Sequence, residues 1–107
     1  MESKLKTTKG ICFICGCNQG YDKHHCCHGT ANRRLAEGER LWVYLCRDCH
    51  RKLHDKHEGD DYILMKGQEA WEADCIAHYP YKHHAEQVAR EEFMRIFGKN
   101  YIYEEPN

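Results

Sequence analysis

The chain has 107 residues, with 16 lysines and arginines, 17 aspartates and glutamates, and a formal net charge of −1. This length suits a single domain with one modest hydrophobic core. The longest unbroken apolar run, residues 41–46, is far shorter than the roughly 20 residues that a membrane-spanning helix needs, so we expect no membrane segment.

The N-terminal residues 1–9 are polar and rich in lysine, with no apolar stretch behind them, and they do not look like a secretory signal. We expect them to form a flexible tail, and we expect the protein to reside in a reducing cytoplasm. Clustered cysteines in that compartment bind metal more often than they pair with each other. The eight cysteines and nine histidines are therefore the main functional signal.

Charge and metal-ligating residues are distributed unevenly along the chain. Residues 1–57 carry a net charge of +5 and residues 58–107 a net charge of −6, with histidines counted as neutral. Seven of the eight cysteines and six of the nine histidines lie in the basic part. The part that can bind metal is thus also the part that can attract a polyanion.

Short strands and one helix are predicted around the cysteines. Residues 12–16 form a CxxCG motif, in which a tight turn directs two thiolates at one metal ion and the glycine permits a positive φ. The segment after residue 46 lacks glycine, proline and β-branched residues until Gly59, which favours a helix. In chain order we expect a short strand over 22–27, a polar loop over 28–40, a buried strand over 41–45 and a helix from 47 to about 58.

Two further helices are predicted over the acidic part, from about 61 to 78 and from about 84 to 97. Each has an apolar stripe at helical spacing, and Gly98 stands where a helix C-cap is expected. These stripes are typical of a hydrophobic core. We therefore expect a zinc-stapled domain over 10–59 and a helical extension over 60–107 that packs on it, in an α+β fold.

Four of the cysteines form two CxxC pairs: Cys12, Cys15, Cys46 and Cys49. Zn²⁺ favours tetrahedral sulfur coordination, and a closed shell of four thiolates leaves no position for a substrate. The sequence therefore predicts a structural Zn²⁺ site that is needed for folding. The alternative is that these are ordinary buried or redox-active cysteines.

Four histidines form a second cluster, His24 and His25 on the predicted strand and His50 and His54 on the predicted helix. At about 100° per residue, the helical cysteine pair and the helical histidine pair lie about 90° apart, so one helix can hold two different metal ions. Neighbouring strand residues point to opposite faces, so one of the two strand imidazoles can ligate while the other stays beside the metal as a base. A base and a divalent cation together can hydrolyse a phosphodiester. The plainer alternative is that the histidines are solvated surface residues.

The run from Cys12 to His54 ends in LCRDCHRKLH, and it resembles the zinc-containing HNH endonucleases of the ββα-metal (His-Me finger) class. The segments HH through GTANRR, LWVYLC and EFMRIFGKNY look like small HNH proteins encoded by phages and prophages. The resemblance implies a treble-clef-like ββα-metal domain with C-terminal helices. It also implies a metal-dependent endonuclease that cleaves DNA in a bacterial host cell.

Carried over residue by residue, the resemblance makes His25 the general base and Asn32 the residue that orients the loop or the base. His24, His50 and His54 become the ligands of a second divalent metal, which could be Mg²⁺, Mn²⁺, Ni²⁺ or Zn²⁺. Three imidazoles suit the last three ions, whereas Mg²⁺ prefers oxygen. The products would carry 5′-phosphate and 3′-hydroxyl ends.

Basic residues share the loop and helix with the predicted ligands, and each could neutralise one phosphate. No base-reading module is recognisable, so we expect duplex or branched DNA as the partner, with little sequence specificity. The candidate DNA-binding residues are Arg33, Arg34, Arg40, Arg47, Arg51 and Lys52. The competing hypotheses are a non-catalytic zinc module that binds nucleic acid or a recombination or phage protein, and a redox-sensing cysteine protein.

Overall fold

The computed structural model describes residues 2–27, 30–80 and 83–102. Within these ranges the protein is α+β, with one two-stranded antiparallel sheet and four helices. In chain order the elements are β1 (Asp22–His25), α1 (Thr30–Gly38), β2 (Trp42–Leu45), α2 (Arg47–Lys56), α3 (Asp60–His78) and α4 (Ala85–Phe97). None of these helices combines the length and apolar composition that a membrane span requires. Residues 81–82 and 103–107 of the expected extension lie outside the described ranges.

The two strands form a hairpin whose faces are chemically different. Their register pairs His24 with Val43 and His25 with Trp42. Because opposed residues of antiparallel strands share a face, His24 lies on one face with Val43, and His25 lies on the other with Trp42. The alternation therefore separates the two adjacent histidines, as the sequence predicts for any strand.

Most of the segment between the strands is a helix and not the polar loop expected over 28–40, of which residues 28–29 lie outside the described ranges. α1 covers residues 30–38, and its Ala36 is fully buried. The other side chains of this helix are mostly polar, so the short apolar face was too weak a signal to distinguish a helix from a loop. The difference matters because α1 carries Glu37 to the hairpin.

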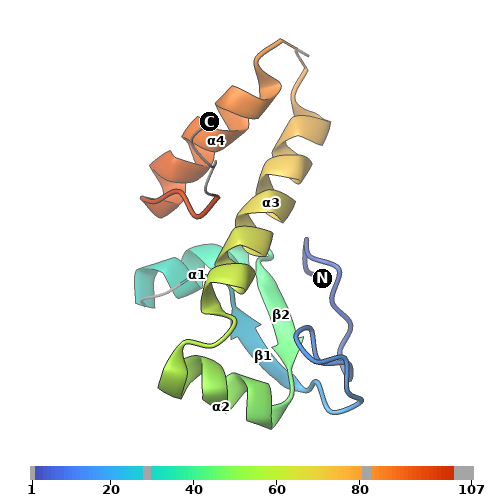
Figure 1. Ribbon diagram of the computed structural model, residues 1–107. Coiled ribbons are helices and arrows are strands. Elements are labelled where there is room, and N and C mark those ends of the chain that lie inside the picture. Colours follow the sequence, from blue (N-terminus) through green and yellow to red (C-terminus); the bar gives the residue numbers. More distant parts are fainter. Residues whose placement is uncertain (1, 28–29, 81–82, 103–107) are drawn as a thin grey trace, which may run out of the picture.

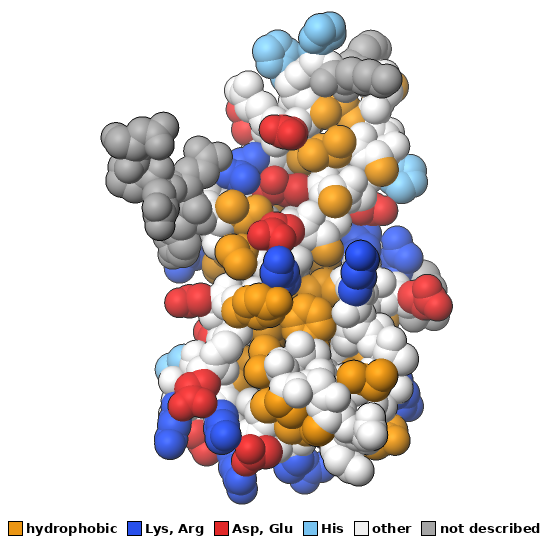
Figure 2. Space-filling view, turned by 45° about the vertical axis from the view of Figure 1, so that its right-hand side comes forward, with side chains coloured by type: hydrophobic (Ala, Val, Ile, Leu, Met, Phe, Trp, Pro, Cys, Tyr) orange, Lys and Arg blue, Asp and Glu red, His pale blue; other side chains and the backbone are white. Residues whose placement is uncertain are grey.

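The N-terminal segment, which we define as residues 3–9, lies alongside β2 (Figure 1). The sequence led us to expect a flexible tail there. The Lys4 amide donates to the Arg40 carbonyl at 2.8 Å, and the Tyr44 amide donates to the Thr7 hydroxyl at 3.0 Å. Leu5 is buried. On one side of this segment a groove of about 840 Å³ separates it from α3. Figure 2, turned toward this side, shows apolar side chains in the middle with lysine or arginine side chains on either side.

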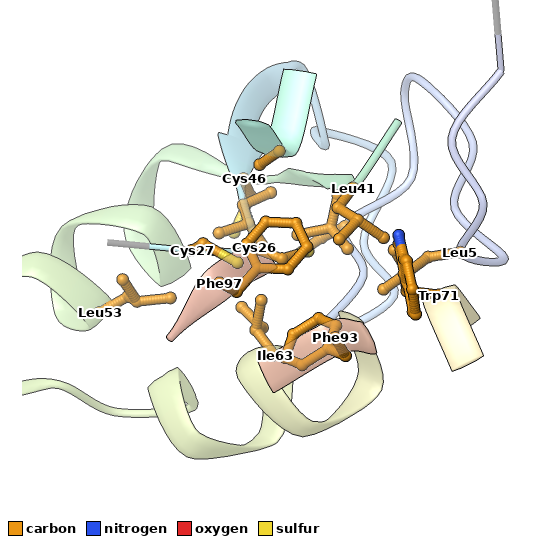
Figure 3. Close-up of a cluster of buried hydrophobic side chains, with 14 residues drawn as sticks. Leu5, Cys26, Cys27, Leu41, Cys46, Leu53, Ile63, Trp71, Phe93 and Phe97 are labelled. Atoms are coloured by element: carbon orange, nitrogen blue, oxygen red, sulfur yellow. The ribbon is translucent and has the colours of Figure 1, made fainter. Parts of the chain in front are cut away.

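One hydrophobic cluster joins the hairpin to the C-terminal helices (Figure 3). It combines Leu41, which directly precedes β2, and Leu45 of β2 with Ile63 of α3 and Phe93 of α4. α3 runs away from the hairpin, and α4 runs back toward the hairpin alongside α3 (Figure 1). Gly67 lets α3 approach closely, because a Cβ there would lie 2.8 Å from the Cβ of Cys26. The helical extension therefore shares its core with the metal-binding part.

A buried polar network fixes α4 against α3. The Gln68 amide donates to Glu72 at 2.7 Å and to Asn100 at 2.8 Å, and its carbonyl accepts from the Tyr101 amide at 2.6 Å. Arg90 donates to the same Glu72 carboxylate at 2.8 Å. Buried polar groups are costly unless they are paired, and here Gln68 is fully buried with its partners in place. This network involves none of the cysteines or histidines of the predicted metal sites.

Candidate metal centres and catalytic histidine

The four predicted cysteines form a cluster that could hold a metal ion. Cys12 and Cys15 come from the loop before β1, and Cys46 and Cys49 come from the start of α2. Their thiols all lie within 4.8 Å of one another, and the sulfurs of Cys15 and Cys46 are 3.8 Å apart. Two sulfurs in a tetrahedral shell with Zn–S bonds of about 2.3 Å would be about 3.8 Å apart. The donor set and its spacing therefore fit Zn²⁺.

Local backbone geometry places both halves of this cysteine cluster. The Cys12 sulfur accepts a hydrogen bond from the Cys15 amide at 3.5 Å, and the Cys46 sulfur accepts one from the Cys49 amide at 3.4 Å. Cys46 is thereby the N-cap of α2. The loop that carries the first pair is closed by a hydrogen bond from the Gly10 amide to the Gly20 carbonyl at 2.7 Å. Each cysteine pair is thus held by its own turn.

The thiols of the cluster differ in acidity. Burial opposes ionisation of Cys12, but hydrogen bonds from the Cys15, Cys46 and Ile14 amides outweigh it and lower the pKa of Cys12 to about 6. Burial, followed by the neighbouring thiols, raises the pKa of Cys49. Four thiolates at this spacing would repel each other. A divalent cation supplies the charge that lets all four ionise together.

Three predicted histidines form the second cluster. His24 lies on β1, and His50 and His54 lie one turn apart on α2; their ligand atoms are all within 4.8 Å of one another. The Nε2 atoms of His50 and His54 are 3.0 Å apart. Two nitrogens bound to one ion at about 2.0–2.1 Å would be separated by about 2.9–3.4 Å, depending on the angle between them. The imidazoles are therefore placed to share one cation, on a different face of α2 from the cysteines.

Asp22 is a functional candidate that the sequence analysis missed. Its carboxylate is 3.1 Å from Nδ1 of His50 and 3.1 Å from Nε of Arg47. The hydrogen bond from His50, and to a lesser extent Arg47, holds the pKa of Asp22 below its usual value. An ionised carboxylate can only accept, so Nδ1 of His50 carries the proton and Nε2 faces the other imidazoles. Carboxylates that orient metal-binding histidines in this way strengthen metal binding.

His25 has a carboxylate partner of its own. Its Nε2 atom is 2.7 Å from Glu37, and Lys23 donates to the other oxygen of the same carboxylate at 2.9 Å. These contacts, first from Lys23 and then from His25, lower the pKa of Glu37. Because Glu37 is ionised at neutral pH, Nε2 of His25 carries the proton and Nδ1 is the proton acceptor. Glu37 therefore fixes the tautomer that a general base needs.

The two chemical groups lie at neighbouring residues of β1, on opposite faces. Within the described residues β1 pairs with β2 alone, α1 carries the Glu37 that contacts His25 on one face, and α2 carries the imidazoles that adjoin His24 on the other. Both groups therefore flank the edge of β1 that no described strand covers. The arrangement places a candidate proton acceptor and a candidate cation-binding cluster one residue apart on the same strand.

Asn32 lies in the first turn of α1 and is half-buried. No hydrogen bond between described residues joins its side chain to His25 or to the three-histidine cluster. The contact to His25 is made instead by Glu37, one and a half turns further along the same helix. The orienting role that the resemblance implies for Asn32 stays a prediction.

The predicted phosphate-binding residues fall into three groups. Arg47, Arg51 and Lys52 lie on α2, where Arg47 pairs with Asp22 and the other two pair with Asp48. Arg40 lies in the turn before β2 with a φ of 59° and lines the groove beside α3. Arg33 and Arg34 are exposed on α1.

The chain matches no known protein-family model, no curated protein and no solved structure. The functional proposal therefore depends on the geometry of the side chains described above.

Proposed function

We propose that this protein is a metal-dependent endonuclease of the HNH type that hydrolyses DNA phosphodiester bonds. The observation that carries the proposal is the juxtaposition at β1 of a carboxylate-bound His25 with the cluster of His24, His50 and His54. One strand edge thus presents a base and a cation site to one phosphate. Neither group alone would suggest hydrolysis.

The chain's own residues supply the proton chemistry. His25 accepts a proton from the attacking water at Nδ1, while Glu37 holds Nε2–H at 2.7 Å and stabilises the imidazolium that forms. A divalent cation bound by the three imidazoles would supply positive charge for the phosphoryl group and the leaving 3′ oxygen. The products would be a 5′-phosphate and a 3′-hydroxyl.

The fold is compatible with a treble-clef-like ββα-metal domain. A cysteine-bearing loop, a two-stranded hairpin and a helix follow one another, and the helix begins at the second cysteine pair. The departure from a bare ββα unit is α1, which connects the strands. In this proposal α1 replaces a connecting loop and contributes Glu37 to the site.

Three imidazoles are a donor set for Zn²⁺, Ni²⁺ or Mn²⁺ more than for Mg²⁺. DNA binding would be supported by the basic residues on α1 and α2, of which Arg33 and Arg34 are exposed. Exposed ion pairs such as those of Arg51 and Lys52 with Asp48 are weak, so a phosphate could replace the carboxylate. A phage or prophage origin remains part of the proposal.

The experiment that tests the proposal is His25→Ala. Zinc-loaded protein is incubated with supercoiled plasmid and with Mg²⁺, Mn²⁺, Ni²⁺ or Zn²⁺ in turn, and nicking is followed on a gel. Loss of a general base lowers the rate by about 10²–10⁴-fold. Zinc content and far-UV circular dichroism should stay as in the parent protein.

His78→Ala is the matched control, because His78 is an exposed histidine at the end of α3, away from the cluster. It should cleave as fast as the parent. If His25→Ala also cleaves at the parent rate, His25 is not the base. If the parent cleaves no plasmid with any of the four ions, the nuclease proposal fails for duplex DNA.

A non-catalytic zinc module is the second candidate, and the observation that favours it is that no hydrogen bond between described residues joins Asn32 to His25 or to the histidine cluster. Metal counting separates the two functions. The nuclease should bind one tightly held Zn²⁺ and one exchangeable cation, whereas a binding module needs only the first. A second cation that is lost in His54→Ala would support the nuclease.

A further inference from the structure

A second groove, of about 560 Å³, lies on the other side of the N-terminal segment. We call it the hairpin groove. Its lining is mostly polar, in contrast to an apolar docking site. The side chains that matter for its chemistry are Lys6, Thr7, Thr8, Lys9, Trp42 and Tyr44.

The hairpin groove shares a sheet face with His25. Trp42 and Tyr44 line the groove, and they stand opposite His25 and Lys23 in the strand register. Side chains of directly opposed residues lie on the same face. Lys23 confirms this placement, because its Nζ lies 3.9 Å from the centre of the Trp42 ring. A ligand in the groove can therefore extend over Trp42 to His25.

The lysines of this groove differ from the basic residues of α2. Lys6 and Lys9 are exposed, and neither forms an ion pair with another residue in the described ranges. Arg47, Arg51 and Lys52 are each paired with a carboxylate. An ammonium group without a carboxylate partner can bind a phosphate without first giving up an ion pair. Glu2 is the acidic residue that lines the groove, so two lysines face one carboxylate there.

The arrangement of groove and site suits a polynucleotide strand. The N-terminal segment is hydrogen-bonded to β2, and β2 is hydrogen-bonded to β1. The contacts to β2 itself are made by the Ser3 and Thr7 hydroxyls, so the segment lies beside β2 and β1 lies on its other side. A single polynucleotide strand laid across β2 can therefore contact both the segment and β1.

We propose that the hairpin groove binds the phosphodiester backbone of the nucleic acid, with Lys6 and Lys9 neutralising phosphates that neighbour the one at His25. Hydroxyl groups such as that of Thr8 are suitable donors to the same backbone. The inference rests on the proposed function in one respect, namely that the bound polynucleotide continues from the groove to His25. Binding of the polynucleotide in the groove does not require that the protein cleaves it.

The experiment measures binding without cleavage. Zinc-loaded full-length protein, with no other divalent ion added, is titrated into a fluorescein-labelled DNA duplex at 50 and at 200 mM salt, and anisotropy is recorded. The variants are Lys6→Ala with Lys9→Ala, and the charge-matched control Arg95→Ala with Lys99→Ala, two exposed basic residues at or just after the end of α4 and outside the groove. Zinc content and circular dichroism verify that each variant is folded.

Each lost phosphate contact reduces the logarithmic salt dependence of binding by about 0.9. The fourfold change in salt should therefore weaken binding of the parent about tenfold more than it weakens binding of the Lys6/Lys9 variant. The control pair should behave as the parent does. A Lys6/Lys9 variant with the parent's affinity and salt dependence overturns the inference, even if the protein cleaves DNA. Conversely, if the affinity depends on Lys6 and Lys9 but the parent protein cleaves no DNA, the groove binds nucleic acid and the proposed nuclease function fails.

Discussion

The cysteine cluster and the histidine cluster share one helix but differ in the number of ligands they offer. Each cluster mixes buried and exposed side chains, with Cys15 and His54 as the exposed members. The cysteines number four, and backbone amides donate to the sulfurs of Cys12 and Cys46, whereas the clustered histidines of the described residues number three. A closed shell of sulfur stabilises a fold, whereas an open shell of imidazoles leaves coordination positions for water and substrate. α2 thus presents a complete set of four thiols on one face and an incomplete set of three imidazoles on another.

Removing a cysteine ligand should have the largest effect. Cys46→Ala deletes one thiolate and the N-cap of α2, and structural Zn²⁺ sites hold about 10–16 kcal/mol of apparent binding free energy, as much as a whole domain's stability. We expect the variant to bind no zinc and to be largely unfolded at 25 °C. Circular dichroism and metal analysis measure both.

Cys75→Ala is the control for this loss, because Cys75 is half-buried on α3 outside the cluster. Cys75→Ala should lower the free energy of unfolding by about 1 kcal/mol. A folded, cooperative Cys46→Ala variant would show that the chain does not need the metal.

Opening the histidine cluster should leave the fold unchanged. His54→Ala removes one of three imidazoles, and we expect zinc-loaded protein to lose measurable binding of a second cation. Calorimetry with Ni²⁺ measures the stoichiometry, which should fall from one to zero. His78→Ala should keep a stoichiometry of one. An unchanged stoichiometry in His54→Ala would mean that the ion binds elsewhere.

A smaller effect is expected from Asp22, which touches the cluster only through His50. Asp22→Asn keeps the size of the side chain but removes its charge, and the loss of such a partner weakens metal affinity by about 10–100-fold. Asp48→Asn is the control on the same helix, since Asp48 pairs with Arg51 and Lys52 instead. Equal nickel affinities for the two variants would show that Asp22 does not orient the ligand.

The smallest effect concerns acid and Glu37. Its pKa lies below the usual 4.5, so its contacts stabilise the fold above that pH, and the stabilisation disappears as pH falls through the lowered pKa. Glu37→Gln should therefore lower the free energy of unfolding at pH 7 by less than about 1 kcal/mol, and the difference should shrink as the pH falls below 4.5, down to the pH at which the protonated cysteines release zinc. A difference that stays undiminished over that range would have another cause.

The sequence predicts the two metal-binding groups well because both depend on local geometry. The CxxC spacing defines each cysteine pair, and the helical wheel separates Cys46 and Cys49 from His50 and His54. The strand alternation likewise separates His24 from His25. The structure confirms the cysteine cluster and brings the three predicted imidazoles together.

Asp22 and Glu37 could not be predicted in the same way. Their roles depend on which helix packs on which face of the hairpin, and sequence spacing contains no signal for that. Glu37 gave no signal of its own because its helix is too polar to be distinguished from a loop: among the described side chains of α1, Ala36 is the one that is fully buried. The buried Gln68 of α3 is likewise unpredictable in its contacts, because its partner Asn100 lies 32 residues away.

The loop closed by Gly10 and Gly20 has a consequence for the order of folding. A Cβ at Gly20 would overlap the Ile11 backbone, so only glycine permits this closure. Cys12 and Cys15 are therefore assembled within a loop of about ten residues, whose closure costs little entropy. Capture of an ion by this short loop can precede the arrival of α2, which must be brought back across some thirty residues of chain. The metal would then bind Cys12 and Cys15 early in folding and only afterwards link them to Cys46 and Cys49 of α2.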